Sequence, residues 1–111
     1  MGERVRWPRG AGGGTEPPDV LELWDWTLGP GDRHVSEAHA PGTKELLQVH
    51  EGTVVVEVAD HSVTLEAGDA VAFAGEVAHS YANPHQEPAR FSLAVFEPGV
   101  GSGSREAAAD A

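Results

Sequence analysis

The chain has 111 residues, 40% of them hydrophobic, which is enough for one small domain with a buried core. Its formal net charge is −11 with only seven Lys and Arg residues, which argues against direct nucleic-acid binding because such binding needs clustered basic side chains. Cysteine is absent, which excludes disulfides and thiolate metal sites, and no apolar run could cross a bilayer, so we expect a soluble cytoplasmic protein with no membrane partner.

The N-terminal region combines a polar arm with the first strand. Residues 1–18 are rich in Arg, Gly and Pro, which predicts a flexible arm with room for one short edge strand. Residues 20–28 are predicted as a strand because Trp and β-branched residues recur between Pro-Asp and Gly-Pro-Gly. Trp24 and Trp26 share one face of this strand. They either pack on the core or line a pocket or dimer interface.

The middle of the chain combines alternating apolar residues with a carboxylate. Residues 33–40 are predicted as a short strand in which His34 is solvated. Residues 45–50 and 53–58 are predicted as consecutive strands joined by a tight turn at Gly52. Glu45 shares its face with Leu47 and Val49, whereas His50 points the other way. A carboxylate on a core face implies a partner inside: a metal, an arginine or a proton.

The C-terminal half continues the same alternation. Strands are predicted around residues 61–65, 70–73, 79–83 and 91–96, with His61 solvated, Val63 and Leu65 on one face, and Val71 and Phe73 inward. His79, Tyr81 and Asn83 share a parity, so an imidazole faces the same interior as Glu45. Residues 99–111 are predicted as a disordered tail. About eight or nine short strands with no convincing helix predict an all-β sandwich or barrel, and a jelly roll fits.

Residues 39–52 resemble the first sequence motif of the cupin superfamily. Six residues separate Glu45 from Gly52, as in that motif. His39 lies where the first motif histidine is expected, and Pro41 replaces the second. Because proline has neither an imidazole nor an N–H, one of the four usual ligands is lost.

The second cupin motif is matched by Gly68, His79 and Asn83. Where that motif has Pro and then Gly, this chain has Ala74 and Glu76, with Gly75 one place early. The resemblance extends over residues 20–98. It implies a double-stranded β-helix, the cupin jelly-roll barrel, at residues 19–98. More narrowly, the chain is similar to the C-terminal sensor cupin of XRE-type regulators, and 111 residues leave no room for their helix-turn-helix.

The resemblance implies that His39, Glu45 and His79 project into one cavity. Two histidines and a carboxylate with open positions suit Fe(II), Mn(II), Ni(II) or Zn(II). Alternatively, Glu45 is hydrogen-bonded to a histidine or to Lys44, and His79 to Asn83 or a backbone carbonyl. The residue considered for acid or base catalysis is Tyr81.

Two functions follow from this comparison. The first is a sensor-type cupin that binds a small molecule, and the sequence favours this function over catalysis without deciding between them. Its apolar pocket would be lined by the following residues: Trp24, Leu47, Val56, Phe73, Tyr81 and Leu93. The alternative is a small metal-dependent enzyme, either a dioxygenase, an isomerase or an epimerase. The resemblance also implies a homodimer.

Overall fold

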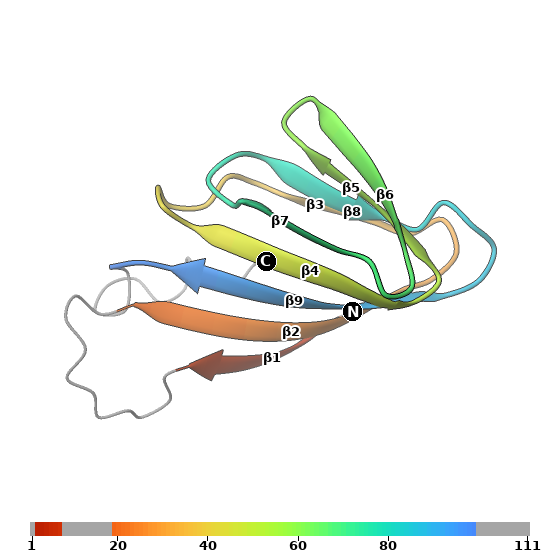
Figure 1. Ribbon diagram of the computed structural model, residues 1–111, viewed down its shortest axis with the longest axis horizontal. Helices are drawn as coiled ribbons and strands as arrows, with labels where there is room; N and C mark the ends of the chain where they lie inside the picture. The colour runs from red at the N-terminus through yellow and green to blue at the C-terminus, as the bar shows by residue number, and fades with distance from the viewer. Residues whose placement is uncertain (1, 8–18, 100–111) are drawn as a thin grey trace.

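The computed structural model describes residues 2–7 and 19–99, with side chains described from residue 19 onward. These residues form nine strands and no helix: β1 (Gly2–Trp7), β2 (Val20–Leu28), β3 (Arg33–Ser36), β4 (Lys44–Glu51), β5 (Thr53–Val58), β6 (His61–Glu66), β7 (Ala70–Ala74), β8 (His79–Ala82) and β9 (Ala89–Glu97). The predicted all-β class is confirmed (Figure 1). The division into arm, barrel and tail falls largely on residues outside the described ranges and stays a prediction. In the described part of the chain, no helix has the length and apolarity that crossing a bilayer requires.

The strands form two sheets that lie one over the other (Figure 1). The larger sheet has the order β1-β2-β9-β4-β7, and the smaller has the order β3-β8-β5-β6. Neighbouring strands are antiparallel throughout. Because the chain passes repeatedly between the sheets, β4 and β8 lie in opposite layers. These two strands carry Glu45 and His79, so the fold can bring the two side chains together from opposite sides.

Alternation with a period of two decides which side chains of β4 face the interior. Buried and exposed residues alternate along this strand, and Glu45, Leu47 and Val49 are the buried ones, as predicted. His50 is exposed, also as predicted. The turn after β4 needs glycine for two reasons. Gly52 has φ of 76°, and a Cβ there would lie 2.6 Å from the carbonyl oxygen of Pro88.

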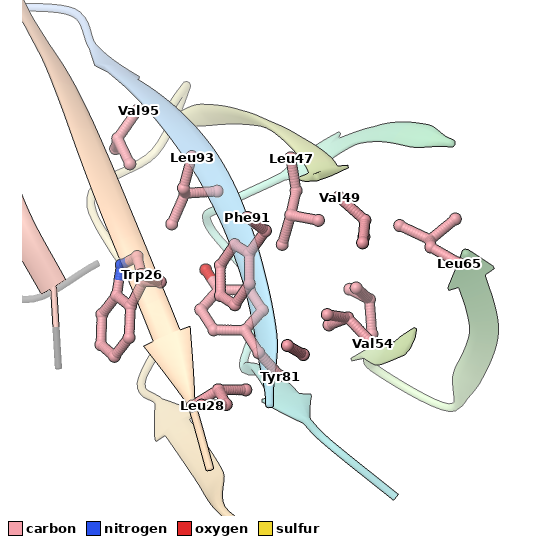
Figure 2. Packing of buried hydrophobic residues seen from close by; sticks show 12 residues of the cluster. Trp26, Leu28, Leu47, Val49, Val54, Leu65, Tyr81, Phe91, Leu93 and Val95 are labelled. Carbon is pink, nitrogen blue, oxygen red and sulfur yellow. The ribbon is translucent and has the colours of Figure 1, made fainter. Parts of the chain in front are cut away.

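The core fills the space between the two sheets (Figure 2). Aromatic rings pack at its centre, where Trp26 stacks on Phe91 with ring centroids 6.0 Å apart and Tyr81 lies 5.5 Å from Phe91. Trp24 is half-buried and packs against this cluster, which agrees with a core-packing role for both tryptophans. Val71 and Phe73 also pack against it, as predicted.

One strand boundary predicted from the sequence is wrong. The strand expected over residues 33–40 ends at Ser36, because its partner β8 begins at His79, directly opposite Ser36. Beyond that point the chain has no strand to pair with in this sheet. Val63 and Leu65, predicted on one face of β6, differ in burial, since Val63 is 39% exposed and Leu65 5% exposed. Alternation therefore identified the correct side of β6 but not how far along the strand the core extends.

Candidate metal centre

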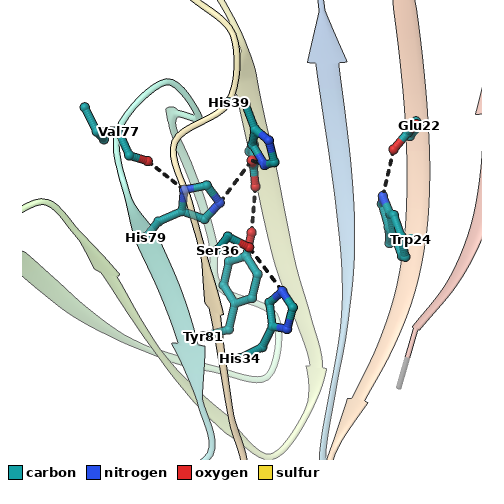
Figure 3. A network of polar contacts seen from close by, with 9 residues as sticks. Glu22, Trp24, His34, Ser36, His39, Val77, His79 and Tyr81 are labelled. Carbon is teal, nitrogen blue, oxygen red and sulfur yellow. Dashed lines mark hydrogen bonds and ion pairs between the residues drawn. The ribbon is translucent and has the colours of Figure 1, made fainter. Parts of the chain in front are cut away.

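Three side chains converge at one end of the space between the sheets (Figure 3). The Nε2 atom of His79 lies 3.2 Å from Oε2 of Glu45, and Nε2 of His39 lies 3.5 Å from the same oxygen. All three ligand atoms lie within 4.8 Å of one another. Glu45 comes from β4 and His79 from the first position of β8, whereas His39 lies on the loop between β3 and β4.

The orientation of His79 is held by the backbone. Its Nδ1 lies 2.8 Å from the carbonyl oxygen of Val77, the distance of a hydrogen bond in which the ring nitrogen donates (Figure 3). A neutral imidazole that donates from Nδ1 presents a lone pair at Nε2, the atom that faces Glu45. A backbone carbonyl is a common partner for the far nitrogen of a metal-binding histidine.

Glu45 is held in turn by Tyr81. The Tyr81 hydroxyl donates a hydrogen bond of 2.6 Å to Oε1 of Glu45. The two oxygens of this buried carboxylate thus have different surroundings, because Oε1 faces the tyrosine and Oε2 faces the histidines. Lys44, considered above as a partner for Glu45, is exposed on the opposite side of β4.

The polar atoms at this site fit a bound cation. Within residues 19–99, Oε2 of Glu45 and Nε2 of His39 are buried and have no hydrogen-bond partner. Ligands that bind one ion at about 2.1 Å lie roughly 3.0–3.5 Å apart when adjacent. The two contacts to Oε2 of Glu45, 3.2 and 3.5 Å, have this spacing, whereas the three ligand atoms together lie within 4.8 Å, so a bound ion would draw the two imidazoles closer together. Among the arginines whose side chains the structure describes, Arg33 and Arg90 form their ion pairs with exposed carboxylates elsewhere, so neither is the partner of Glu45. Nitrogen and carboxylate donors of this kind suit Fe(II), Mn(II), Ni(II) and Zn(II).

Comparison with known families agrees with the fold. The family model described as “Cupin domain” matches residues 24–96, which include all three residues of the cluster. The chain belongs to the cupin family. The predicted cupin jelly-roll barrel is thereby confirmed.

Solved cupin structures resemble this one over about two thirds of its length. The cupin domain of an XRE family transcriptional regulator from Enterobacter cloacae is 27% identical, with a TM-score of 0.66, and the match covers 68% of this chain and 79% of that one. An HTH_3 family transcriptional regulator from Vibrio cholerae is 31% identical, with a TM-score of 0.67, covering 70% of this chain and 43% of the regulator. This cupin thus spans less than half of that regulator.

An enzyme is also among the similar structures. A sugar phosphate isomerase of the cupin superfamily from Silicibacter pomeroyi is 29% identical, with a TM-score of 0.53. The match covers 71% of this chain and 50% of that enzyme. No curated protein sequence matches this cupin. The comparisons therefore establish the family of this chain but not its function.

This cupin departs from the family motif at two places near the site. Pro41, at the position of the missing ligand, is exposed. Gly75, one residue before the expected motif glycine, packs directly against Glu45, since a Cβ at this position would lie 2.8 Å from Oε2. The sequence indicated this glycine only through its shifted position in the motif.

The residues predicted to line a ligand pocket belong to the packed interior. Leu47, Val56, Tyr81 and Leu93 have no exposed surface, and Trp24 and Phe73 pack around them. Ligand binding among these side chains stays a prediction. The metal centre lies next to this interior. Its most exposed member is His39, whose side chain is 8% exposed, whereas the side chains of Glu45 and His79 are fully buried.

The prediction that His34 is solvated is wrong, although it lies outside the ligand cluster. Its ring is half-buried, lies parallel to that of Tyr81 at 5.9 Å, and lies 4.6 Å from that of Trp26. Its Nε2 also contacts the hydroxyl of Ser36 at 3.1 Å. Its aromatic partners, Trp26 and Tyr81, belong to other strands, so the pattern along its own strand could not reveal them. His61, in contrast, is exposed, as predicted.

Asn83 has a structural function that motif spacing did not indicate. Its buried Nδ2 group lies within hydrogen-bond distance of three backbone carbonyls, those of Leu28, Gly29 and Glu87. Its Oδ1 accepts a bond of 3.0 Å from the backbone N–H of His85. The amide therefore joins the turn after β2 to the loop before β9.

Proposed function

We propose that this cupin is a sensor-type, small-molecule-binding protein whose barrel holds a divalent cation between His39, Glu45 and His79. The observation that supports this most directly is the convergence of two imidazole nitrogens on one buried carboxylate oxygen. Such a cation would supply Lewis acidity and open positions for an oxygen-bearing ligand. A ligand would reach it past His39, the member of the cluster nearest to solvent.

A binding function is favoured over catalysis by the position of Tyr81. This residue is the acid or base that the sequence suggested, yet it is fully buried and its hydroxyl already donates to Glu45. A group that transfers protons to a substrate must come within hydrogen-bond reach of it. The similar regulator structures also support sensing. The similarity to a sugar phosphate isomerase keeps a metal-dependent enzyme as the second candidate.

The proposed function is tested on wild-type protein purified without chelator. We expect about one equivalent of Fe, Mn, Ni or Zn by elemental analysis and a rise in Tm of about 10 to 20 °C when free metal reaches about 100 times Kd. A panel of small metabolites should raise the Tm of the metal-loaded form further. Absence of metal, with no thermal shift at millimolar Mn, Fe, Ni or Zn, would refute the cation site. Turnover of a sugar phosphate or uptake of oxygen would instead establish the enzyme.

We also propose that the protein is a homodimer of the cytoplasm that does not itself bind DNA. The outer face of the larger sheet supports self-association. Leu23, Ala94, Leu46 and Ala72 lie in register across four strands, and Leu23 and Leu46 are 46% and 52% exposed. Contiguous exposed apolar surface of this kind is typical of interfaces. The outward positions of these strands carry little of the acidic charge that would make two copies repel.

Leu46→Glu is expected to weaken this dimer. A carboxylate at the centre of the apolar row would be buried twice in a two-fold interface, so we expect the dissociation constant to rise about 10-fold or more. Sedimentation velocity over a range of concentrations measures the change. Val35→Glu is the matched control, because Val35 is 61% exposed on the other sheet and the charge change is the same. A monomeric wild type, or equal dimerisation of both variants, would contradict this interface.

A further inference from the structure

Residues 75–77, which follow β7, contact all three ligand residues or the loop that carries His39. Gly75 accepts a 2.9 Å hydrogen bond at its carbonyl from the backbone N–H of His39. The carbonyl of Val77 contacts Nδ1 of His79 at 2.8 Å (Figure 3). Between these two residues, Glu76 uses Oε1 to accept a 2.6 Å hydrogen bond from the backbone N–H of Gly42. Residues 75–77 therefore contact the loop that carries His39 as well as the ring of His79.

Close packing at Gly75 completes this arrangement. A Cβ at this position would lie 2.8 Å from Oε2 of Glu45 and 2.7 Å from Cγ2 of Thr43. Both distances are far below van der Waals contact, so no larger residue could be placed there without moving the carboxylate. The N–H of Gly75 also donates to the carbonyl of Thr43 at 2.8 Å. Residue 75 thus fixes the distance between this loop and the start of β4.

His39 depends on these contacts more than the other two members of the cluster. Glu45 and His79 are held by the hydrogen bonds of strands β4 and β8, whereas residues 37–43 form no strand. This loop is tied to the rest of the site by three hydrogen bonds, from His39 to Gly75, from Gly75 to Thr43 and from Gly42 to Glu76. The bond from Gly42 to Glu76 has a carboxylate acceptor, which makes it short and charge-assisted, and it lies at the solvent-exposed surface.

We propose that Glu76 is a positioning residue that holds the loop carrying His39 and thereby sets the metal affinity of the site. This proposal rests on the cation site proposed above. Glu76 does not belong to the ligand cluster and acts through Gly42, three residues beyond His39. Where the cupin motif has a glycine, this chain has a side chain that can clamp the loop. Because Pro41 removes one usual ligand, each remaining ligand must contribute a larger share of the binding energy.

The test compares variants of the full chain by metal titration against a competing chelator. Glu76→Ala is expected to raise the metal Kd about 10- to 100-fold, the usual range for residues that orient ligands. Glu76→Gln keeps an oxygen that can accept the Gly42 N–H, so it should restore most of the affinity. Glu37→Ala is the matched control, because Glu37 is exposed in the same loop and its removal changes the charge equally. The metal-free Tm of Glu76→Ala should stay within a few degrees of wild type, which separates positioning from general destabilisation.

Unchanged affinity in Glu76→Ala would overturn the proposal, and so would equal weakening in all three variants, which would indicate a charge effect. If wild-type protein binds no metal, the proposed cation site is refuted. The role of Glu76 in holding the loop is then tested by hydrogen exchange of the Gly42 amide alone. The role is supported if the Gly42 amide exchanges slowly in wild type and at least about 10-fold faster in Glu76→Ala, with no such change in Glu37→Ala. Exchange that is equally fast in wild type and Glu76→Ala would overturn it.

Discussion

Glu45→Gln is expected to raise the metal Kd by at least about 100-fold. The substitution keeps the shape of the side chain and leaves an amide oxygen that can accept the bond from Tyr81. It places an NH₂ group where Oε2 faces the two histidines, and an amide nitrogen donates hydrogen bonds but does not bind cations. Loss of residues that merely orient ligands weakens binding about 10- to 100-fold, so loss of the single anionic ligand should exceed that range.

Calorimetric titration with Zn(II) or Mn(II) measures this effect, and circular dichroism verifies that the variant keeps its β-sheet spectrum. Glu57→Gln is the matched control. Glu57 is half-exposed on the outer side of the smaller sheet, where it pairs with Arg33 at 3.0 Å, and its neutralisation should leave the metal Kd unchanged. If Glu45→Gln binds metal as tightly as wild type, the convergence of these three residues does not constitute a metal site.

Asn83→Ala is expected to lower the free energy of unfolding by about 2–4 kcal/mol. The alanine would leave the backbone N–H of His85 and several backbone carbonyls without their partner at a buried position. Each buried group that loses its hydrogen bond costs about 1–3 kcal/mol, and water can reach some of them at the edge of the loop. The loss would be a large fraction of the total stability of a domain of this size.

Urea denaturation followed by tryptophan fluorescence measures this change. An unchanged m-value would show that unfolding exposes the same amount of surface in the variant as in wild type. Gln86→Ala is the control, since Gln86 is an exposed amide of the same loop and its removal should change the stability by less than about 0.5 kcal/mol. A similarly small effect of Asn83→Ala would mean that its hydrogen bonds contribute nothing to the fold.

The fold was predictable because strand alternation is a local property. The parity of Glu45, Leu47 and Val49 identified the buried side of β4 from sequence alone, and it marked the carboxylate as unusual. His79 and its neighbour Tyr81 followed from the same argument on β8. Burial along β6 was less predictable, since Val63 and Leu65 share a face by alternation and yet are 39% and 5% exposed.

The site was predictable only in part, because its supporting contacts join segments that are distant in sequence. Motif spacing selected His39, although its loop has no periodicity of its own. It did not indicate that Glu76 would accept a bond from Gly42, 34 residues earlier, or that Asn83 would contact the carbonyl of Leu28. His34 was misassigned for the same reason, since its aromatic neighbours come from other strands.

The placement of Glu45 on one sheet and His79 on the other has a kinetic consequence. An ion bound to both would join the two layers as a removable crosslink at one end of the barrel. The layers must separate for the protein to unfold, so the occupied state should persist longer at high temperature and resist proteolysis for longer. The lifetime of the protein would then follow the supply of metal in its surroundings, even where no ligand is present to be sensed.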